Sequence, residues 1–378
     1  MLPPAPIRRL LLVPLVVVIG LALAALAPPV ALLSAAYNLI RRDRPGRVRR
    51  SRLLRVIILG LVWSAGEAAA LAVFLGLWLA SGFGGRLETE PYQARHYAVL
   101  TWFLDLVYRT AARVGALTVT VTGPPQPGEP QPGEPEPGEP GPGEPGPAGD
   151  RPLIVLSRHA GPGDSLLLLH YLLSECRRRP RVVMKATLQL DPTADIVANR
   201  LPNAFLRRPA RGPGARTVSA RQRTEQIRRL AAGLPGQGAL VIFPEGGNWT
   251  PQRWQRGIER LRQGGRADLA ERAAAMPNLL PPHGSGALAA IAACPRADVI
   301  FVAHAGLDQL VSVRDVWRSL HADMTVVARW WRVPAASVPA ATDPDAQLSW
   351  LYDWWERIDG WITAERPRTA GPAGPPLS

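Results

Sequence analysis

A histidine and an aspartate five residues apart, at the end of an apolar run, could carry out acid–base chemistry together. His159 follows the apolar run 153–157, and the loop to Asp164 contains Gly161 and Gly163. Such a loop can fold back so that the carboxylate accepts the imidazole N–H, which fixes the tautomer and leaves the other ring nitrogen free as a general base. Taken separately, the two residues are also compatible with a loop histidine and a helix N-cap.

A glycine-rich turn follows a second apolar run later in the chain. Its glycines allow backbone N–H groups to approach a ligand closely. The same pattern is compatible with an ordinary turn that carries a solvated glutamate. The residues concerned are Phe243, Pro244, Glu245, Gly246, Gly247 and Asn248.

Basic side chains between these two motifs are of a kind that binds phosphate. Lys185 is the chain's only lysine, and Arg207 and Arg208 follow Phe205 closely. A guanidinium forms bidentate hydrogen bonds with phosphate oxygens. A solvated basic face is the alternative for such a run of charge.

The elements that must hold these motifs alternate between strands and helices. Beyond residue 150, short apolar runs alternate with helical patterns, which indicates an α/β fold with a mostly parallel sheet flanked by helices. Such folds place their sites at the carboxyl ends of the strands. The predicted strands are 117–122, 153–157, 181–184, 239–243, 299–303 and 324–330, and the predicted helices are 97–113, 165–176, 217–232, 254–263, 286–293 and 346–364.

Two long apolar runs near the N-terminus predict a helical membrane anchor. Residues 11–27 nearly reach the roughly 20 apolar residues that cross a bilayer. The second run, 56–80, is interrupted only by Glu67. A secretory signal is the alternative for the first run, but the second run favours an anchor. Three prolines are expected to kink or end the first helix, namely Pro14, Pro28 and Pro29.

An arginine-rich loop, residues 41–52, lies between the two apolar runs. The positive-inside rule places this loop in the cytoplasm, so two full spans would put the rest of the chain outside. A hairpin that dips into one leaflet keeps the loop and both ends on the cytoplasmic side. We therefore expect the protein at the cell membrane, with the catalytic domain on the cytoplasmic side.

The composition of the chain excludes several classes of protein. The 378 residues carry a formal net charge of +14 and two cysteines, which excludes a disulfide scaffold or a cysteine-based metal cluster. No nucleic-acid-binding motif accompanies the positive charge, so no nucleic-acid partner is expected. A Pro/Gly/Glu repeat of period five, residues 125–144, reads as a solvated linker or as a ligand for a proline-recognising partner.

Taken in order, the motifs resemble those of glycerolipid acyltransferases of the lysophosphatidate acyltransferase superfamily. The family's His-x4-Asp block is matched by His159 and Asp164, and its Phe-Ile-x-Arg-like block by 205–208. Its Phe-Pro-Glu-Gly block is matched by 243–246, and its proline-containing block loosely by 279–282. Gly247-Asn248 replaces the usual Thr-Arg, which is more similar to the lysophospholipid and lysocardiolipin branch.

The resemblance implies a glycerol-3-phosphate acyltransferase-like fold and a division of the chain. Residues 1–95 would form the membrane anchor and 96–366 the acyltransferase domain. The segment 123–150 would interrupt that domain as a linker, and 367–378 would form a disordered tail.

The resemblance also implies a reaction. An acyl group would move from acyl-CoA or acyl carrier protein to a hydroxyl of a lysophospholipid such as 1-acyl-glycerol-3-phosphate, at a phospholipid membrane. His159 would be the general base and Asp164 would orient it, with neither metal nor cofactor. The substrate-binding residues would be Lys185, Phe205, Arg207, Arg208, Phe243, Pro244, Glu245, Gly246, Gly247, Asn248 and Pro281.

Two other functions remain open. Gly163–Leu166 reads Gly-Asp-Ser-Leu, the nucleophile block of a class of serine esterases, with Ser165 as nucleophile, but no later histidine has the required aspartate three residues before it. A catalytically inactive membrane-associated relative is the second alternative.

The tryptophan-rich helix near the C-terminus has two interpretations. It could touch the membrane surface, where tryptophan is favoured, or it could pack on the domain. Its apolar residues are Leu348, Trp350, Leu351, Trp354, Trp355, Ile358, Trp361 and Ile362.

Overall fold

A computed structural model of the chain describes residues 3–40, 52–114, 117–122, 150–206, 215–307 and 324–369. Its contacts divide the chain into two units, each described here by itself. The first comprises Met1–Thr118, Lys185–Pro202 and Val313–Met324, and the second comprises Val119–Met184, Asn203–Ser312 and Thr325–Ser378. The predicted linker and the site residues Arg207 and Arg208 lie outside the described residues.

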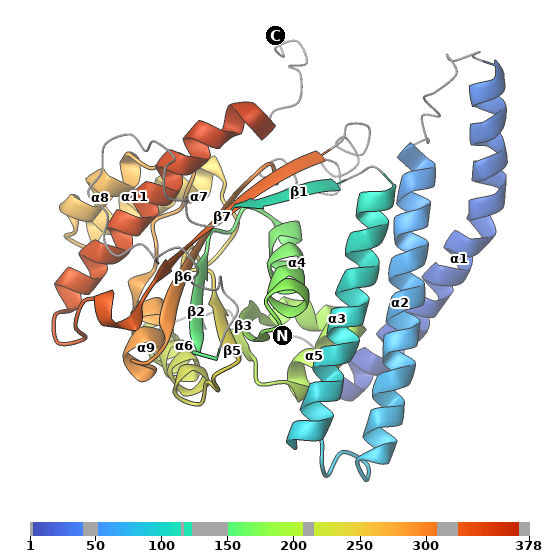
Figure 1. Cartoon of the computed structure of the whole chain (residues 1–378), viewed down its shortest axis with the longest axis horizontal. Coiled ribbons are helices and arrows are strands. Elements are labelled where there is room, and N and C mark those ends of the chain that lie inside the picture. Colours follow the sequence, from blue (N-terminus) through green and yellow to red (C-terminus); the bar gives the residue numbers. More distant parts are fainter. Residues whose placement is uncertain are drawn as a thin grey trace. The chain divides into compact units, whose positions relative to one another are not determined.

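The first unit is helical. It contains α1 (Ala5–Ile40), α2 (Arg52–Ala80), α3 (Glu90–Arg113), a 3-10 turn (Ala186–Leu190) and α5 (Pro192–Arg200). Helices α1 and α2 are long and apolar enough to cross a membrane, as expected from the two apolar runs (Figure 1). They pack closely through glycine, because a Cβ atom at Gly60 would lie 2.9 Å from Cδ1 of Leu23.

The expectation that prolines would interrupt the first helix is wrong in one respect. Helix α1 continues through Pro14, Pro28 and Pro29 for 36 residues. Proline is tolerated in long apolar helices when neighbouring helices and small backbone adjustments compensate for the lost hydrogen bonds.

Charged residues fasten α5 to the helices around it. Asp195 is 1 % exposed and accepts hydrogen bonds from Nη2 of Arg8 at 2.6 Å and from Nε of Arg9 at 2.8 Å. Nη1 of Arg200 donates to the carbonyl oxygen of Phe74 at 2.8 Å. The first turns of α1 and the later part of α2 are therefore both held by α5.

The second unit is built on a seven-stranded sheet with the order β1-β7-β6-β2-β5-β3-β4. Strand β2 lies between β5 and β6 and pairs with both in parallel, whereas β7 is antiparallel to β6. The predicted α/β class with a mostly parallel sheet is confirmed. The strands are β1 (Leu117–Thr122), β2 (Leu153–Ser157), β3 (Arg179–Lys185), β4 (Ala204–Leu206), β5 (Gly238–Ile242), β6 (Asp298–Ala305) and β7 (Met324–Val333).

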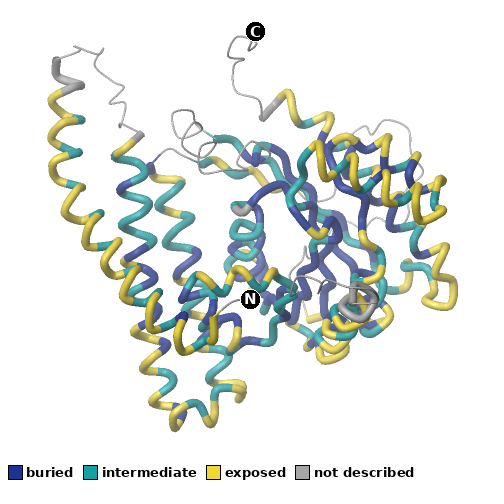
Figure 2. The backbone as a smooth tube through the Cα atoms, turned by 180° about the vertical axis from the view of Figure 1, so that it is seen from behind, coloured by how far each residue is buried: buried dark blue, intermediate teal, exposed yellow. Residues whose placement is uncertain are grey.

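Helices cover both faces of this sheet, and β2 shows the division. Ile154 and Leu156 face one apolar cluster with residues of α6, α7, α8, α9 and α11, while Leu153 and Val155 face another with α4 and the π-helical turn after it. All five residues of β2 are buried. In Figure 2 the buried residues gather around the strands, whereas exposed residues lie mostly on the helices. The helices are α4 (Pro162–His170), the π turn (Tyr171–Glu175), α6 (Ala215–Ala232), α7 (Pro251–Gln263), α8 (Ala267–Ala274), α9 (Gly284–Ala293) and α11 (Pro344–Thr369).

Helix α11 packs on the domain through its apolar face, which agrees with the second of its two interpretations. Leu351, Trp355 and Ile358 are fully buried in the core. The ring of Trp354 stacks on Phe301 of β6 with centroids 4.6 Å apart. These side chains bury their apolar surface against the sheet, which removes it from any contact with lipid.

Candidate active site

The structure brings His159 and Asp164 together at the carboxyl end of β2. The strand ends at Ser157, and α4 starts at Pro162 with Gly161 as its N-cap residue. This short turn returns the carboxylate of Asp164 to the imidazole, with Nδ1 of His159 at 3.1 Å from both carboxylate oxygens. The ring remains partly accessible, with 13 % of the side chain exposed.

Asp164 is held as a buried carboxylate. Its Oδ2 accepts the backbone N–H groups of Ala160 at 2.7 Å and Gly161 at 3.0 Å, and its Oδ1 accepts the hydroxyl of Ser165 at 3.0 Å. Burial by itself would raise the pKa of Asp164, but hydrogen bonds and charge from His159 and His304 outweigh it and hold this pKa well below its usual range. An ionised partner at Nδ1 leaves Nε2 as the ring nitrogen that can take a proton.

A second histidine shares the same carboxylate. His304, in β6, is 5 % exposed and places Nε2 at 3.5 Å from Oδ2 of Asp164. Nη1 of the buried Arg158 donates to the carbonyl oxygen of His304 at 2.6 Å. The ends of β2 and β6 are therefore linked twice. Arg158 donates from one to the other, and the carboxylate of Asp164 lies close to both histidines.

Glu245 joins three segments of backbone. Its Oε1 accepts the N–H of His159 at 2.8 Å, and its Oε2 accepts the N–H of Leu280 at 3.0 Å. Burial raises the pKa of Glu245 to about 8, against the opposing effects of Arg158 and of these two N–H donors. The side chain is 3 % exposed, so it positions the backbone around the histidine.

The rest of the glycine-rich turn also lies against the histidine. The ring of Phe243 is 4.6 Å from the imidazole between centroids. The backbone N–H of Trp249 donates to the carbonyl oxygen of His159 at 3.1 Å. The predicted motifs at 159–164 and 243–248 therefore form one local structure.

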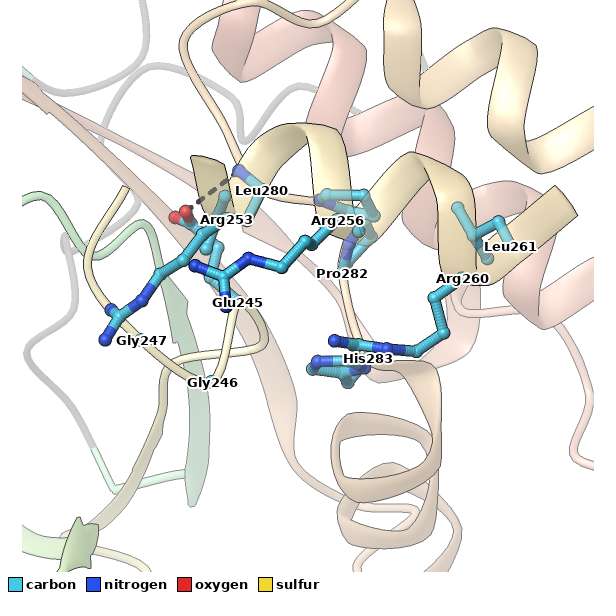
Figure 3. A pocket seen from close by; sticks show the side chains of 12 residues that line it. Glu245, Gly246, Gly247, Arg253, Arg256, Arg260, Leu261, Leu280, Pro282 and His283 are labelled. Carbon is cyan, nitrogen blue, oxygen red and sulfur yellow. Dashed lines mark hydrogen bonds between the residues drawn. The ribbon is translucent and has the colours of Figure 1, made fainter. Parts of the chain in front are cut away.

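A cavity of about 370 Å³ opens beside this turn. Four of the predicted substrate-binding residues line it, namely Glu245, Gly246, Gly247 and Pro281. Figure 3 shows that arginines of α7 extend toward this turn and that the side chain of Arg260 lies beside His283. The arginines are Arg253, Arg256 and Arg260.

The remaining predicted substrate-binding residues that the structure describes do not line the cavity. Pro244 is buried and Asn248 is half-buried next to this cavity, where the carbonyl oxygen of Asn248 accepts Nη1 of Arg253 at 3.0 Å. Phe205 is half-buried in β4. Lys185 is exposed and is the last residue of β3.

Sequence reasoning missed His304, Arg158 and the arginines of α7. A signal for His304 was present, because it ends an apolar run in the same way that His159 does, and parallel neighbours place such residues at one edge of the sheet. The spacing of the three arginines also puts them on one side of a helix. No signal in the sequence indicates that Arg158 would be buried.

The hydroxyl of Ser165 is directed to Asp164 rather than to a histidine. In serine hydrolases the nucleophile hydrogen-bonds to the base that activates it. The described residues contain no group of three or more His, Cys, Asp or Glu side chains that could hold a metal ion.

Comparison with known families agrees with this site. A model of the acyltransferase family matches residues 140–321, a range that contains the His159–Asp164 pair, the 243–248 turn and the arginine-lined cavity. The segment 140–321 is therefore similar to this family, and the chain also has two N-terminal helices long and apolar enough to cross a membrane. Searches among curated proteins and among solved structures gave no match.

Proposed function

We propose that this protein is a membrane-associated O-acyltransferase that moves a fatty acyl group from an acyl thioester to a hydroxyl of a lysophospholipid. The observation that carries the proposal is the bond from Nδ1 of His159 to the buried carboxylate of Asp164. This geometry prepares Nε2 to act as a general base, and the family match supplies the reaction class.

In the proposed reaction Nε2 of His159 takes the proton of the acceptor hydroxyl as its oxygen attacks the thioester carbonyl. The carbon–sulfur bond breaks when the tetrahedral intermediate collapses, and the leaving thiolate receives the proton from the imidazolium. Asp164 stabilises that imidazolium and keeps the ring oriented. Neither a covalent acyl-enzyme nor a metal ion is required in this scheme.

The location of the substrates supports a membrane setting. A lysophospholipid and its two-chain product both reside in a bilayer, and helices α1 and α2 are suited to hold the domain there. The donor would be acyl-CoA or acyl carrier protein, and the domain would lie on the cytoplasmic side of the cell membrane, where these thioesters occur. Gly247-Asn248 favours an acceptor of the lysophospholipid and lysocardiolipin kind.

The experiment is a radiolabelled acyl-CoA assay with the purified full-length chain and a panel of lysophospholipids. We expect label in a two-chain phospholipid, whereas an esterase would release free fatty acid. Ser165→Ala should retain transfer to within about tenfold, because only one hydrogen bond to Asp164 is lost. Release of free fatty acid that depends on Ser165 would overturn the proposal, and no turnover with any acceptor would favour an inactive relative.

A further inference from the structure

One face of α7 directs three arginines into a single cavity. Arg253, Arg256 and Arg260 follow at spacings of three and four, which places them on neighbouring turns of one side of the helix. The opposite wall consists of the segment 280–283 and the turn at Gly246 and Gly247 (Figure 3).

The part of the chain that the structure describes does not neutralise the positive charge in this cavity. Nη1 of Arg253 and Nε of Arg256 donate to backbone carbonyl oxygens, those of Asn248 and Gln252. Among the described residues neither these two arginines nor Arg260 forms an ion pair with a carboxylate. Like charges gathered in about 370 Å³ repel one another, and an anionic ligand would relieve that repulsion.

Segments that line the cavity approach each other closely at two glycines, which indicates a shaped site. A Cβ atom at Gly257 would lie 3.0 Å from Cδ of Pro281, and one at Gly246 would lie 3.2 Å from Cδ2 of His283. Gly246 also has a φ of +66°, a conformation that side chains disfavour. Larger residues at these positions would push the walls apart.

We propose that this cavity is a binding site for the phosphate group of a substrate, with Arg253, Arg256 and Arg260 as its ligands. Guanidinium groups match phosphate oxygens through paired charge-assisted hydrogen bonds. The binding of phosphate in this cavity does not depend on the acyltransferase reaction. Which substrate carries that phosphate is inferred from the proposed function, on which this part of the inference rests. The phosphate belongs either to the headgroup of the lipid acceptor or to the coenzyme A part of the donor.

The cavity is connected to the catalytic pair through Glu245. This side chain lines the cavity and accepts the N–H groups of His159 and Leu280 with its two carboxylate oxygens. Leu280 is itself part of the cavity wall. A phosphate bound by the arginines would therefore sit beside the turn that supports the catalytic histidine.

The test is calorimetric binding to the full-length chain in lipid nanodiscs, with coenzyme A, dephospho-coenzyme A, glycerol 3-phosphate and inorganic phosphate as separate probes. The variants are the double change Arg256→Ala with Arg260→Ala, and the double change of both residues to Lys. Arg262→Ala is the matched control, because Arg262 is an exposed arginine of the same helix that does not line the cavity.

We expect the wild type and the Arg262→Ala control to bind at least one probe with the same affinity. The double alanine variant should lose about tenfold or more for each arginine removed, and the lysine variant should lie between them. Tighter binding of coenzyme A than of dephospho-coenzyme A would assign the cavity to the donor. Binding of glycerol 3-phosphate in preference to both would assign it to the acceptor.

If none of the probes bound the wild type, the phosphate site would be overturned, and equal losses in the Arg262→Ala control would also overturn it. A measurement of acyl transfer in the same variants distinguishes failure of the phosphate site from failure of the proposed function. His159→Ala should keep probe binding while it loses transfer. If the double alanine variant bound every probe normally and transferred acyl groups, the phosphate site would be refuted and the proposed reaction would stand.

Discussion

His304 places Nε2 at 3.5 Å from Oδ2 of Asp164, the carboxylate that also binds Nδ1 of His159. One buried anion therefore faces two imidazoles that come from adjacent parallel strands. His304 therefore faces the same negative charge that orients the base. This makes His304 a positioning residue for the catalytic pair.

Replacement of His304 by Gln should lower kcat by about tenfold and leave KM for the acyl donor within about twofold. The reason is that the carboxylate of Asp164 loses one of the two imidazoles around it, which loosens the hold on His159 without removing a substrate contact. The measurement is kcat and KM for both proteins. An unchanged kcat, or a rise in KM as large as the fall in kcat, would contradict the positioning role.

Replacement of Asp164 by Asn should reduce acyl transfer by about 100- to 10,000-fold, because the imidazole loses the anion that orients and stabilises it. The pH dependence of the protein's stability should also change in this variant. The pKa of Asp164 is lowered in the folded protein, so its stabilising effect is present above the ordinary value of 3.8 and is lost as the pH falls below it.

Thermal unfolding of this variant between pH 3 and pH 6 measures the second effect. The wild type should lose stability toward pH 3 more steeply than Asp164→Asn does. Asp345→Asn, a change at an exposed residue of α11, should behave like the wild type. Parallel pH curves for wild type and Asp164→Asn would contradict the assignment of an ionised carboxylate.

Glu245→Ala should destabilise the second unit by about 1–3 kcal/mol, since two buried N–H groups lose their acceptor. Glu245→Gln should cost less, because its amide oxygen can still accept one of them. Both effects can be read from denaturant unfolding followed by circular dichroism. If alanine and glutamine had the same small effect, Glu245 would not be the link between His159 and Leu280 that the hydrogen bonds indicate.

Asp195→Asn should loosen the attachment of α1 to α5. The aspartate is 1 % exposed and receives two arginines, and breaking a buried ion pair costs about 3–5 kcal/mol. Faster proteolysis near the N-terminus of the protein in detergent would show the change. Asp105→Asn on α3 is the matched control, since its pair with Arg109 at 3.7 Å is more exposed and should contribute about 1 kcal/mol or less.

Much of the fold was predictable because local patterns and burial agree. The strand at 153–157 coincides with β2, whose five apolar or small residues are buried on both faces of the sheet. The strand β4 and the helices α5 and α8 were not predicted. Each of them spans nine residues or fewer, too few for hydrophobic periodicity to show.

The site was predictable only where the sequence spacing is short. A separation of five residues is enough to return Asp164 to His159. The approach of His304 depends on which strands become neighbours, and the carboxylate of Glu245 turns inward to backbone groups of two other segments. Strand order and side-chain direction of this kind come from tertiary packing, which no local pattern records.

The most direct measurement of the central claim compares wild type with His159→Ala in labelled acyl transfer to a lysophospholipid in vesicles. We expect transfer to fall by about 100-fold or more, since the general base is lost, while the variant remains folded and membrane-bound. Undiminished transfer by a correctly folded His159→Ala protein would contradict the claim that this imidazole deprotonates the acceptor.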